Sequence, residues 1–250
     1  MERRGQLSVF VIVAIVIVGI FLIIVVYPRI KVIVGEVEPN SYLKECIAPV
    51  IDETLPRLTA QGGYLEPTSY VLYQGDKVQY LCYTAEDYKP CIVQQPLLVS
   101  HVESEIKKEV EPKARACLDE LKALYERKGY SVSVGRGDVS VGIVTGKINV
   151  EFNAPFTVTK DNTQVFRKFQ VTRDSELYDL LAIATNIIQF ESTLGDSETS
   201  LYLQYYPDLK IEKLKKEADT IYTLTNVVTN DKFRFATRSL VWPSGYGVIK

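Results

Sequence analysis

Hydrophobic and polar residues divide the chain into one uninterrupted apolar segment and a longer part in which the two kinds alternate. The apolar segment runs from Leu7 to Val26 without a charged residue. A helix of that length spans roughly 30 Å, the hydrocarbon thickness of a bilayer. It is longer than the core of a secretory signal, and Tyr27-Pro28-Arg29 follows it in place of a small-residue cleavage site. We expect a transmembrane helix that stays on the protein, with a buried core helix as the alternative.

Three later segments carry apolar residues at the spacing of one helix face. These are residues 41–58, 95–128 and 177–194. Proline lacks an amide hydrogen and clashes with the preceding turn. Pro49 and Pro56 therefore predict a kink or break in the first helix, and Pro112 predicts a bend in the second.

Glycine and short polar residues mark the ends of these helices. Gly62 and Gly63 are expected to end the first helix, because glycine readily adopts the positive φ that a helix terminus needs. Gly195 is expected to end the third helix in the same way. Asp174 or Ser175 is the predicted N-cap of that helix.

Between the second and third helices the chain consists of short β-branched runs separated by Gly, Asn or Asp. This composition predicts an antiparallel meander over residues 130–172. Residues 70–83, with a turn at Gln74–Asp76, and residues 220–240, with a turn at Asn230-Asp231, each predict a hairpin.

These patterns predict an α+β fold, in which an N-terminal transmembrane helix is followed by one exterior domain with an antiparallel sheet packed against helices. Residues 29–37 are interpreted as a short stalk or a first strand. The charged run at residues 212–219 is assigned no strand.

Four cysteines, Cys46, Cys82, Cys91 and Cys117, all follow the apolar segment. The absence of a CxxC motif and the presence of a single histidine, His101, argue against a zinc site. An even number suits two disulfides in an oxidising compartment, for which three pairings exist. We favour Cys82 with Cys91, closing a short loop, and Cys46 with Cys117, joining two helical segments. Four buried free thiols are the alternative.

Composition changes this picture little. The formal net charge is only −2, which predicts neither nucleic-acid binding nor a strong surface field. The chain contains 16 Tyr but one Trp and one Met. Tyrosine joins apolar area to a polar tip, which suits extracellular surfaces and interfaces, although a β-rich core would also use it.

The residues before the apolar segment are more specific. Arg3-Arg4-Gly5-Gln6-Leu7-Ser8 resembles the class III, or prepilin-type, signal peptide of archaeal type IV pilin-like proteins. In that family a basic pair and a glycine precede a glutamine, and a dedicated peptidase cuts between Gly and Gln on the cytoplasmic side. The resemblance covers about 30 residues and implies cleavage between Gly5 and Gln6. Many members have Glu four residues after the Gln, where this chain has Phe10.

The resemblance implies three parts: a leader at 1–5, a transmembrane helix at 6–28 and an extracellular domain at 29–250. Basic residues flank the apolar segment on both sides, at Arg3-Arg4 and at Arg29 and Lys31, so charge alone does not set the orientation. Disulfides would place the large domain outside. An ordinary signal anchor with a basic flank is the alternative interpretation of the motif.

A search for catalytic motifs gives no candidate catalytic residue, metal ligand or cofactor site. Ser100 and His101 are adjacent on a predicted helix and point about 100° apart, so they cannot act as a nucleophile and its base. Arg136-Gly137-Asp138 is the tripeptide that integrin ligands display, and we interpret it as chance. Carboxylates such as Glu103, Glu105 and Asp231 leave a glycosidase-like pair as the enzyme alternative.

The sequence therefore predicts a non-enzymatic, pilin-like structural or adhesive subunit at the cell surface. Expected partners are the membrane, through residues 7–26, a prepilin-type peptidase, and copies of itself or sister pilin subunits; nucleic acid is not expected. The alternative is a monomeric membrane-anchored domain that binds a ligand or acts on glycans.

Overall fold

A computed structural model describes residues 16–18, 38–239 and 241. The chain forms two compact units, Met1–Glu38 and Pro39–Lys250. In the first unit, residues 16–18 are helical; the predicted stalk or strand at 29–37 lies outside the described residues. None of the helices within the described ranges is both long and apolar enough to cross a membrane.

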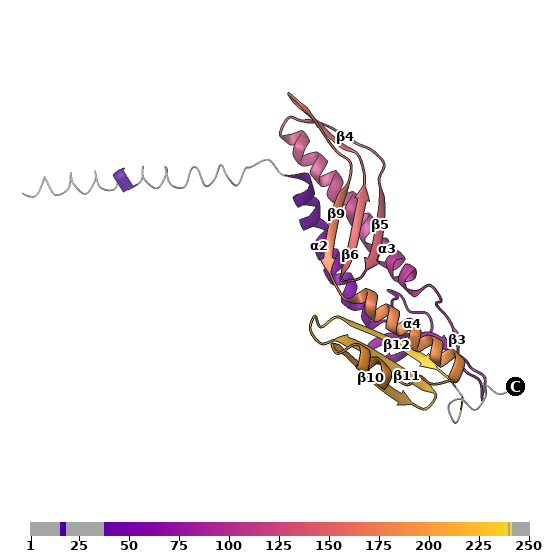
Figure 1. The fold of residues 1–250 in the computed structure, drawn as a ribbon. Helices are drawn as coiled ribbons and strands as arrows, with labels where there is room; N and C mark the ends of the chain where they lie inside the picture. Colours follow the sequence, from indigo (N-terminus) through magenta and orange to yellow (C-terminus); the bar gives the residue numbers. More distant parts are fainter. Residues whose placement is uncertain (1–15, 19–37, 240, 242–250) are drawn as a thin grey trace, which may run out of the picture. The chain divides into compact units, whose positions relative to one another are not determined.

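The second unit is α+β, with antiparallel-rich sheets packed against helices, as predicted (Figure 1). Its first part, here called the helix-pair region, is built on α2 (Pro39–Ala60) and α3 (Leu98–Arg127). The two helices are antiparallel, because Tyr42 near the start of α2 contacts Glu120 of α3, whereas Arg57 near the end of α2 contacts the earlier Glu109. The Cys46–Cys117 disulfide also joins them. Pro49 and Pro56 lie within α2 and Pro112 within α3, and each helix continues through its prolines.

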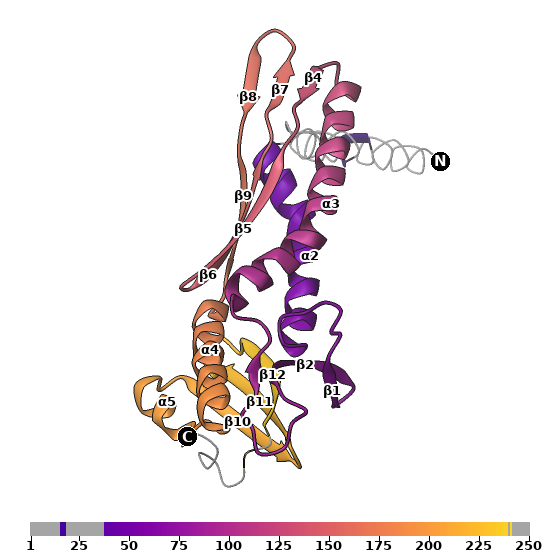
Figure 2. The ribbon, with the colours of Figure 1, turned by 90° about the vertical axis from the view of Figure 1, so that its right-hand side faces the viewer.

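The rest of the helix-pair region consists of six short strands. They are β4 (Ser131–Val134), β5 (Asp138–Val144), β6 (Lys147–Asn153), β7 (Phe156–Thr159), β8 (Thr163–Phe166) and β9 (Phe169–Asp174). They form two antiparallel sheets with the orders β4-β7-β8 and β5-β6-β9. Figure 2 shows these sheets following one another along the helices.

The predicted meander is present, but as three long runs that are each broken once. The runs are β4 with β5, β6 with β7, and β8 with β9. Each run gives one strand to each sheet, and the run formed by β6 and β7 is central in both sheets. The second break contains Pro155, which has no amide hydrogen for a sheet. A Cβ at Gly135, in the first break, would lie 2.5 Å from Cγ of Pro155, so these two breaks pack against each other.

The second part, here called the sheet region, contains a six-stranded sheet and two helices. The strands are β1 (Tyr70–Tyr73), β2 (Asp76–Tyr83), β3 (Ile92–Val93), β10 (Leu209–Lys216), β11 (Asp219–Asn226) and β12 (Lys232–Arg238). The order is β1-β2-β12-β11-β10, with β3 beside β2. Helix α4 (Leu177–Leu194) packs on the sheet, and α5 (Ser200–Tyr205) follows it.

Three predictions about the sheet region need correction. The charged run at 212–219 lies mostly in β10, an edge strand whose two faces are largely exposed. Its sequence therefore does not alternate between apolar and polar residues, and the strand was not predicted. The sheet is not wholly antiparallel, because β12 pairs with β2 in parallel. The N-cap of α4 is Glu176 rather than Asp174 or Ser175, although the Ser175 hydroxyl accepts a hydrogen bond from the Leu177 amide at 3.2 Å.

The predicted turns are found where glycine was expected to allow them. Gly62 and Gly63 follow α2 with φ of 73° and 84°, and Gly195 ends α4 with φ of 77°. A Cβ at Gly63 would lie 2.8 Å from Val102 of α3, so glycine also permits close packing here. This turn leads the chain from the helix-pair region into the sheet region.

Candidate functional site

Several exposed apolar side chains of the sheet region lie on α5, directly after it, and in the loop between β11 and β12. Helix α5 buries none of its residues. Tyr205 is 78% exposed, Tyr206 47% and Val228 69%. Exposed apolar side chains that lie together in this way mark a surface available for interaction.

A hollow of about 300 Å³ opens beside these residues. We call it the aromatic cleft. It is bounded by the first half of α4, by the turn from α5 into β10, and by the end of β11 with the following loop. Its lining consists of Glu176, Asp179, Leu180, Ile183, Tyr205, Tyr206, Pro207, Asp208, Leu209, Asn226, Val228 and Thr229.

Backbone hydrogen bonds hold two walls of the cleft together. The Leu209 amide donates to the Tyr206 carbonyl at 3.0 Å, and the Val227 amide donates to the Asp208 carbonyl at 2.8 Å. The side-chain oxygen of Asn226 accepts from the amides of Val228 and Thr229 at 2.9 and 3.1 Å. The loop that carries Val228 is therefore fixed to the strand that precedes it.

The α4 wall is fixed by Asp231, on the same loop. Its carboxylate accepts hydrogen bonds from the Glu176 amide at 2.6 Å and the Ser175 hydroxyl at 3.1 Å. A carboxylate at a helix start satisfies otherwise unpaired amides. Asp231 thus has a structural role at the start of α4, which places Glu176 and Asp179 at the cleft.

The charged residues that line the cleft are all acidic. Glu176, Asp179 and Asp208 contribute three carboxylates, and no lining residue in the described part of the chain is Lys or Arg. None of the three carboxylates forms an ion pair with another described residue. The described residues also contain no group of three or more His, Cys, Asp or Glu side chains placed to hold a metal ion.

A second hollow, of about 240 Å³, lies on the other side of the β11–β12 loop between α2, α4 and β12. Two of its three charged side chains are already engaged, and the third is Lys232. Asp231 holds the start of α4, and Arg234 donates to Asp76 at 2.9 Å and to Thr223 at 3.3 Å. The aromatic cleft is therefore the better candidate for binding.

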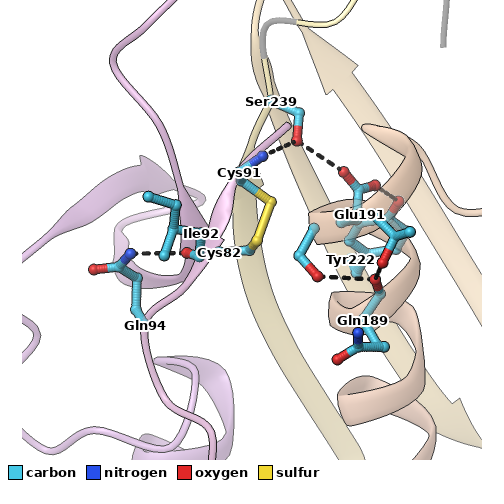
Figure 3. The surroundings of a disulfide bond; sticks show 10 residues. Cys82, Cys91, Ile92, Gln94, Gln189, Glu191, Tyr222 and Ser239 are labelled. Atoms are coloured by element: carbon cyan, nitrogen blue, oxygen red, sulfur yellow. Dashed lines mark hydrogen bonds between the residues drawn. A yellow bond between two sulfur atoms is a disulfide. The ribbon is translucent and has the colours of Figure 1, made fainter. Parts of the chain in front are cut away.

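A buried polar network lies between α4 and the six-stranded sheet (Figure 3). Glu191 of α4 is 1% exposed and accepts a hydrogen bond from the hydroxyl of Tyr222, which is fully buried in β11. Ser239 donates to the other oxygen of Glu191 at 3.4 Å and accepts from the Cys91 amide at 3.2 Å. Burial raises the pKa of Glu191 above its usual value.

The two disulfides join the cysteines in the pairing favoured from the sequence. Cys82 and Cys91 close a short loop with Cα atoms 5.3 Å apart, and Cys46 and Cys117 join α2 to α3 with Cα atoms 6.1 Å apart. No cysteine is left free. The Cys91 amide donates a hydrogen bond to Ser239 and so links the Cys82–Cys91 disulfide to the Glu191 network. Gly5 and Gln6, the predicted processing residues, lie outside the described residues.

The other residues considered from the sequence have structural surroundings. The His101 ring lies 4.0 Å from the Tyr64 ring, and burial lowers the pKa of His101. Glu103 accepts from the Ile143 amide at 2.9 Å, and Glu105 accepts from the Leu65 amide at 3.0 Å. In the 136–138 tripeptide, Asp138 is paired with Lys107 at 3.0 Å. None of these residues lines the aromatic cleft.

Sequence reasoning missed the cleft itself. The Tyr-Tyr-Pro-Asp run at 205–208 is visible in the sequence, as is the general abundance of tyrosine. Its approach to Glu176 and Asn226 depends on contacts among three separate elements, which the local pattern does not encode. Comparison with protein-family models, with curated proteins and with solved structures gave no match.

Proposed function

We propose that this chain is a pilin-like subunit of the cell surface, structural or adhesive, which is anchored or assembled through an N-terminal apolar helix. The large domain faces outward, and the N-terminus faces the cytoplasm. A prepilin-type peptidase removes residues 1–5 by cutting between Gly5 and Gln6, and residues 7–26 remain as a transmembrane helix. Membrane lipid and sister subunits are the partners of that helix.

The observation that carries the proposal is the complete pairing of the four cysteines as two disulfides in the domain that follows the apolar segment. Disulfides of this kind are typical of an oxidising, extracellular environment. An apolar segment of 20 residues with the Arg-Arg-Gly-Gln motif before it supplies a route to that environment.

The aromatic cleft favours a second candidate within the same placement, a monomeric anchored domain that binds a ligand. Exposed Tyr205 and Tyr206 beside uncompensated carboxylates are suited to recognition. Enzymatic action finds less support, because Glu103, Glu105 and Asp231 each accept backbone hydrogen bonds that hold the fold. That the chain is not an enzyme stays a prediction.

Surface display can be tested on intact cells of the native host. Limited proteolysis from outside should remove the domain from the wild-type chain while a cytoplasmic control protein stays whole. Electron microscopy with antibody labelling then separates the two candidates, because a pilus subunit decorates filaments and an anchored monomer decorates the envelope. A domain that survives external protease until the cells are lysed would contradict both.

A further inference from the structure

We propose that the aromatic cleft binds lysine or arginine side chains presented by a basic segment of a partner protein. This inference rests on the proposed recognition role of the domain. It names the chemistry of the partner and the surface that receives it: the carboxylates of Glu176, Asp179 and Asp208 with the rings of Tyr205 and Tyr206.

The size of the cleft suits side chains rather than a large cofactor. Its volume of about 300 Å³ is at the lower end of the range found for sites that enclose small molecules. Tyr205 and Tyr206 line it and are exposed to solvent, so a ligand can enter from the surface. One or two long side chains of a bound segment would fill this space.

The strongest hydrogen-bond acceptors of the lining are its three carboxylates. The Asn226 oxygen is already engaged by the amides of Val228 and Thr229, and the Thr229 hydroxyl accepts from the Asp231 amide at 3.3 Å. Ammonium and guanidinium groups carry donors only, and they supply the positive charge that the lining lacks.

The two tyrosines complete this match. Lysine and arginine have apolar stems that pack on aromatic rings while the charged head reaches a polar group. A cation over a tyrosine ring gains further electrostatic attraction. The same domain already uses this contact elsewhere, since Lys77 lies 5.0 Å from the Tyr70 ring centroid and Arg234 lies 5.0 Å from that of Tyr73.

Neutral sugars and metal ions fit the lining less well. A sugar could pair with the carboxylates and with the Tyr205, Tyr206 and Thr229 hydroxyls, but it would leave the three negative charges uncompensated. A metal ion needs convergent ligands, which the described residues do not provide. A second copy of this chain is a separate occupant and is distinguished by the test below.

The test uses the full chain in a non-ionic detergent and a fluorescent peptide in which lysines alternate with glycines. Binding is followed by fluorescence anisotropy. We expect saturable binding that weakens as salt is raised from about 0.05 M to about 0.3 M, because screening reduces attraction between exposed charges. The same peptide with every lysine acetylated keeps its length and loses its charge, and it should not bind. Free spermidine should compete only weakly. It has charged amines but no peptide chain to contact the residues around the cleft.

Two cleft variants and a matched control locate the site. Glu176→Gln with Asp179→Asn and Asp208→Asn should weaken binding by at least about tenfold, and Tyr205→Ala with Tyr206→Ala by about fivefold. The control changes three exposed carboxylates outside the cleft, Glu53→Gln, Asp87→Asn and Asp161→Asn. It alters the net charge equally and should keep binding within about twofold, which excludes a general charge effect. Thermal unfolding verifies that each variant is folded.

Several results would overturn the proposal. These are equal losses in the cleft and control variants, equal binding of the acetylated peptide, or spermidine binding as tightly as the peptide. Binding of a neutral oligosaccharide that is lost in the tyrosine variant, without peptide binding, would assign the cleft to glycans. Self-association that the cleft variants abolish, without peptide binding, would assign it to a second copy. External proteolysis tests surface display independently, so the two proposals can fail separately.

Discussion

The helix-pair region and the sheet region differ in the side chains that they expose. In the helix-pair region, ion pairs connect neighbouring elements: Lys107 of α3 with Asp138 of β5, and Lys168 with Glu151 of β6. In the sheet region the described carboxylates of the aromatic cleft have no such partner, and aromatic rings beside them face solvent. The sheet region also has ion pairs, such as Arg234 with Asp76, but it alone gathers exposed aromatic rings and carboxylates without ion pairs around one hollow. On our proposal, the helix-pair region is the structural part of the domain and the sheet region is the recognition part.

Each region contains one disulfide, and removing them should give the largest effects. Cys46→Ser with Cys117→Ser removes a crosslink between residues 71 positions apart in the sequence. Cys82→Ser with Cys91→Ser removes one between residues 9 positions apart. On the chain-entropy account the first change costs about 4 kcal/mol and the second about 2.5 kcal/mol. Denaturant unfolding of the full chain measures both. A larger loss from the short loop would show that the link from Cys91 to the Glu191 network outweighs loop length.

The buried network of the sheet region provides the next test. Tyr222→Phe removes the hydroxyl that donates to Glu191 and leaves a buried carboxyl oxygen without that partner. Such a loss costs about 1 to 3 kcal/mol. Tyr73→Phe, which alters a partly buried tyrosine of β1, is the comparison and should cost less. Equal losses would mean that the network contributes little to stability.

These expectations show how much the sequence could predict. The bounds of α4 were predicted at both ends, because its apolar spacing is regular and Gly195 ends it. Strand β10 was missed because most of its residues are exposed on both faces and read as a charged loop. The parallel pairing of β12 with β2 joins Ala236 to Tyr80, residues too far apart in sequence for a local pattern to relate. The cleft depends on such distant contacts.

Stability should also depend on pH through Glu191. Burial raises the folded-state pKa of this carboxyl above its ordinary value of 4.5, so the folded protein favours the neutral form. The contribution of neutral Glu191 to the free energy of unfolding is fully present below about pH 4.5, and it is lost as pH rises through the raised folded-state pKa. Glu191→Gln should therefore lose less stability than the wild type between about pH 4.5 and pH 8. Glu45→Gln, at an exposed site on α2, should follow the wild-type profile.

The surface ion pairs of the helix-pair region should matter least. Arg57 and Glu109 join α2 to α3 at 3.9 Å, with side chains 54% and 43% exposed. Exposed pairs of this kind contribute between about 0 and 1 kcal/mol. Glu109→Gln should change the free energy of unfolding by less than about 0.5 kcal/mol at moderate salt. A larger loss would mean that these ion pairs, and not only the disulfide, hold the two helices together.

Export of the domain is the central claim, and the intact mass of the chain from native membranes tests it most directly. The sample is treated with a thiol-alkylating reagent before and after reduction. We predict a mature chain that begins at Gln6, carries no alkyl group before reduction, and gains four after it, one for each cysteine. A chain that still begins at Met1 and is alkylated without reduction would contradict both processing at Gly5 and exposure to an oxidising exterior.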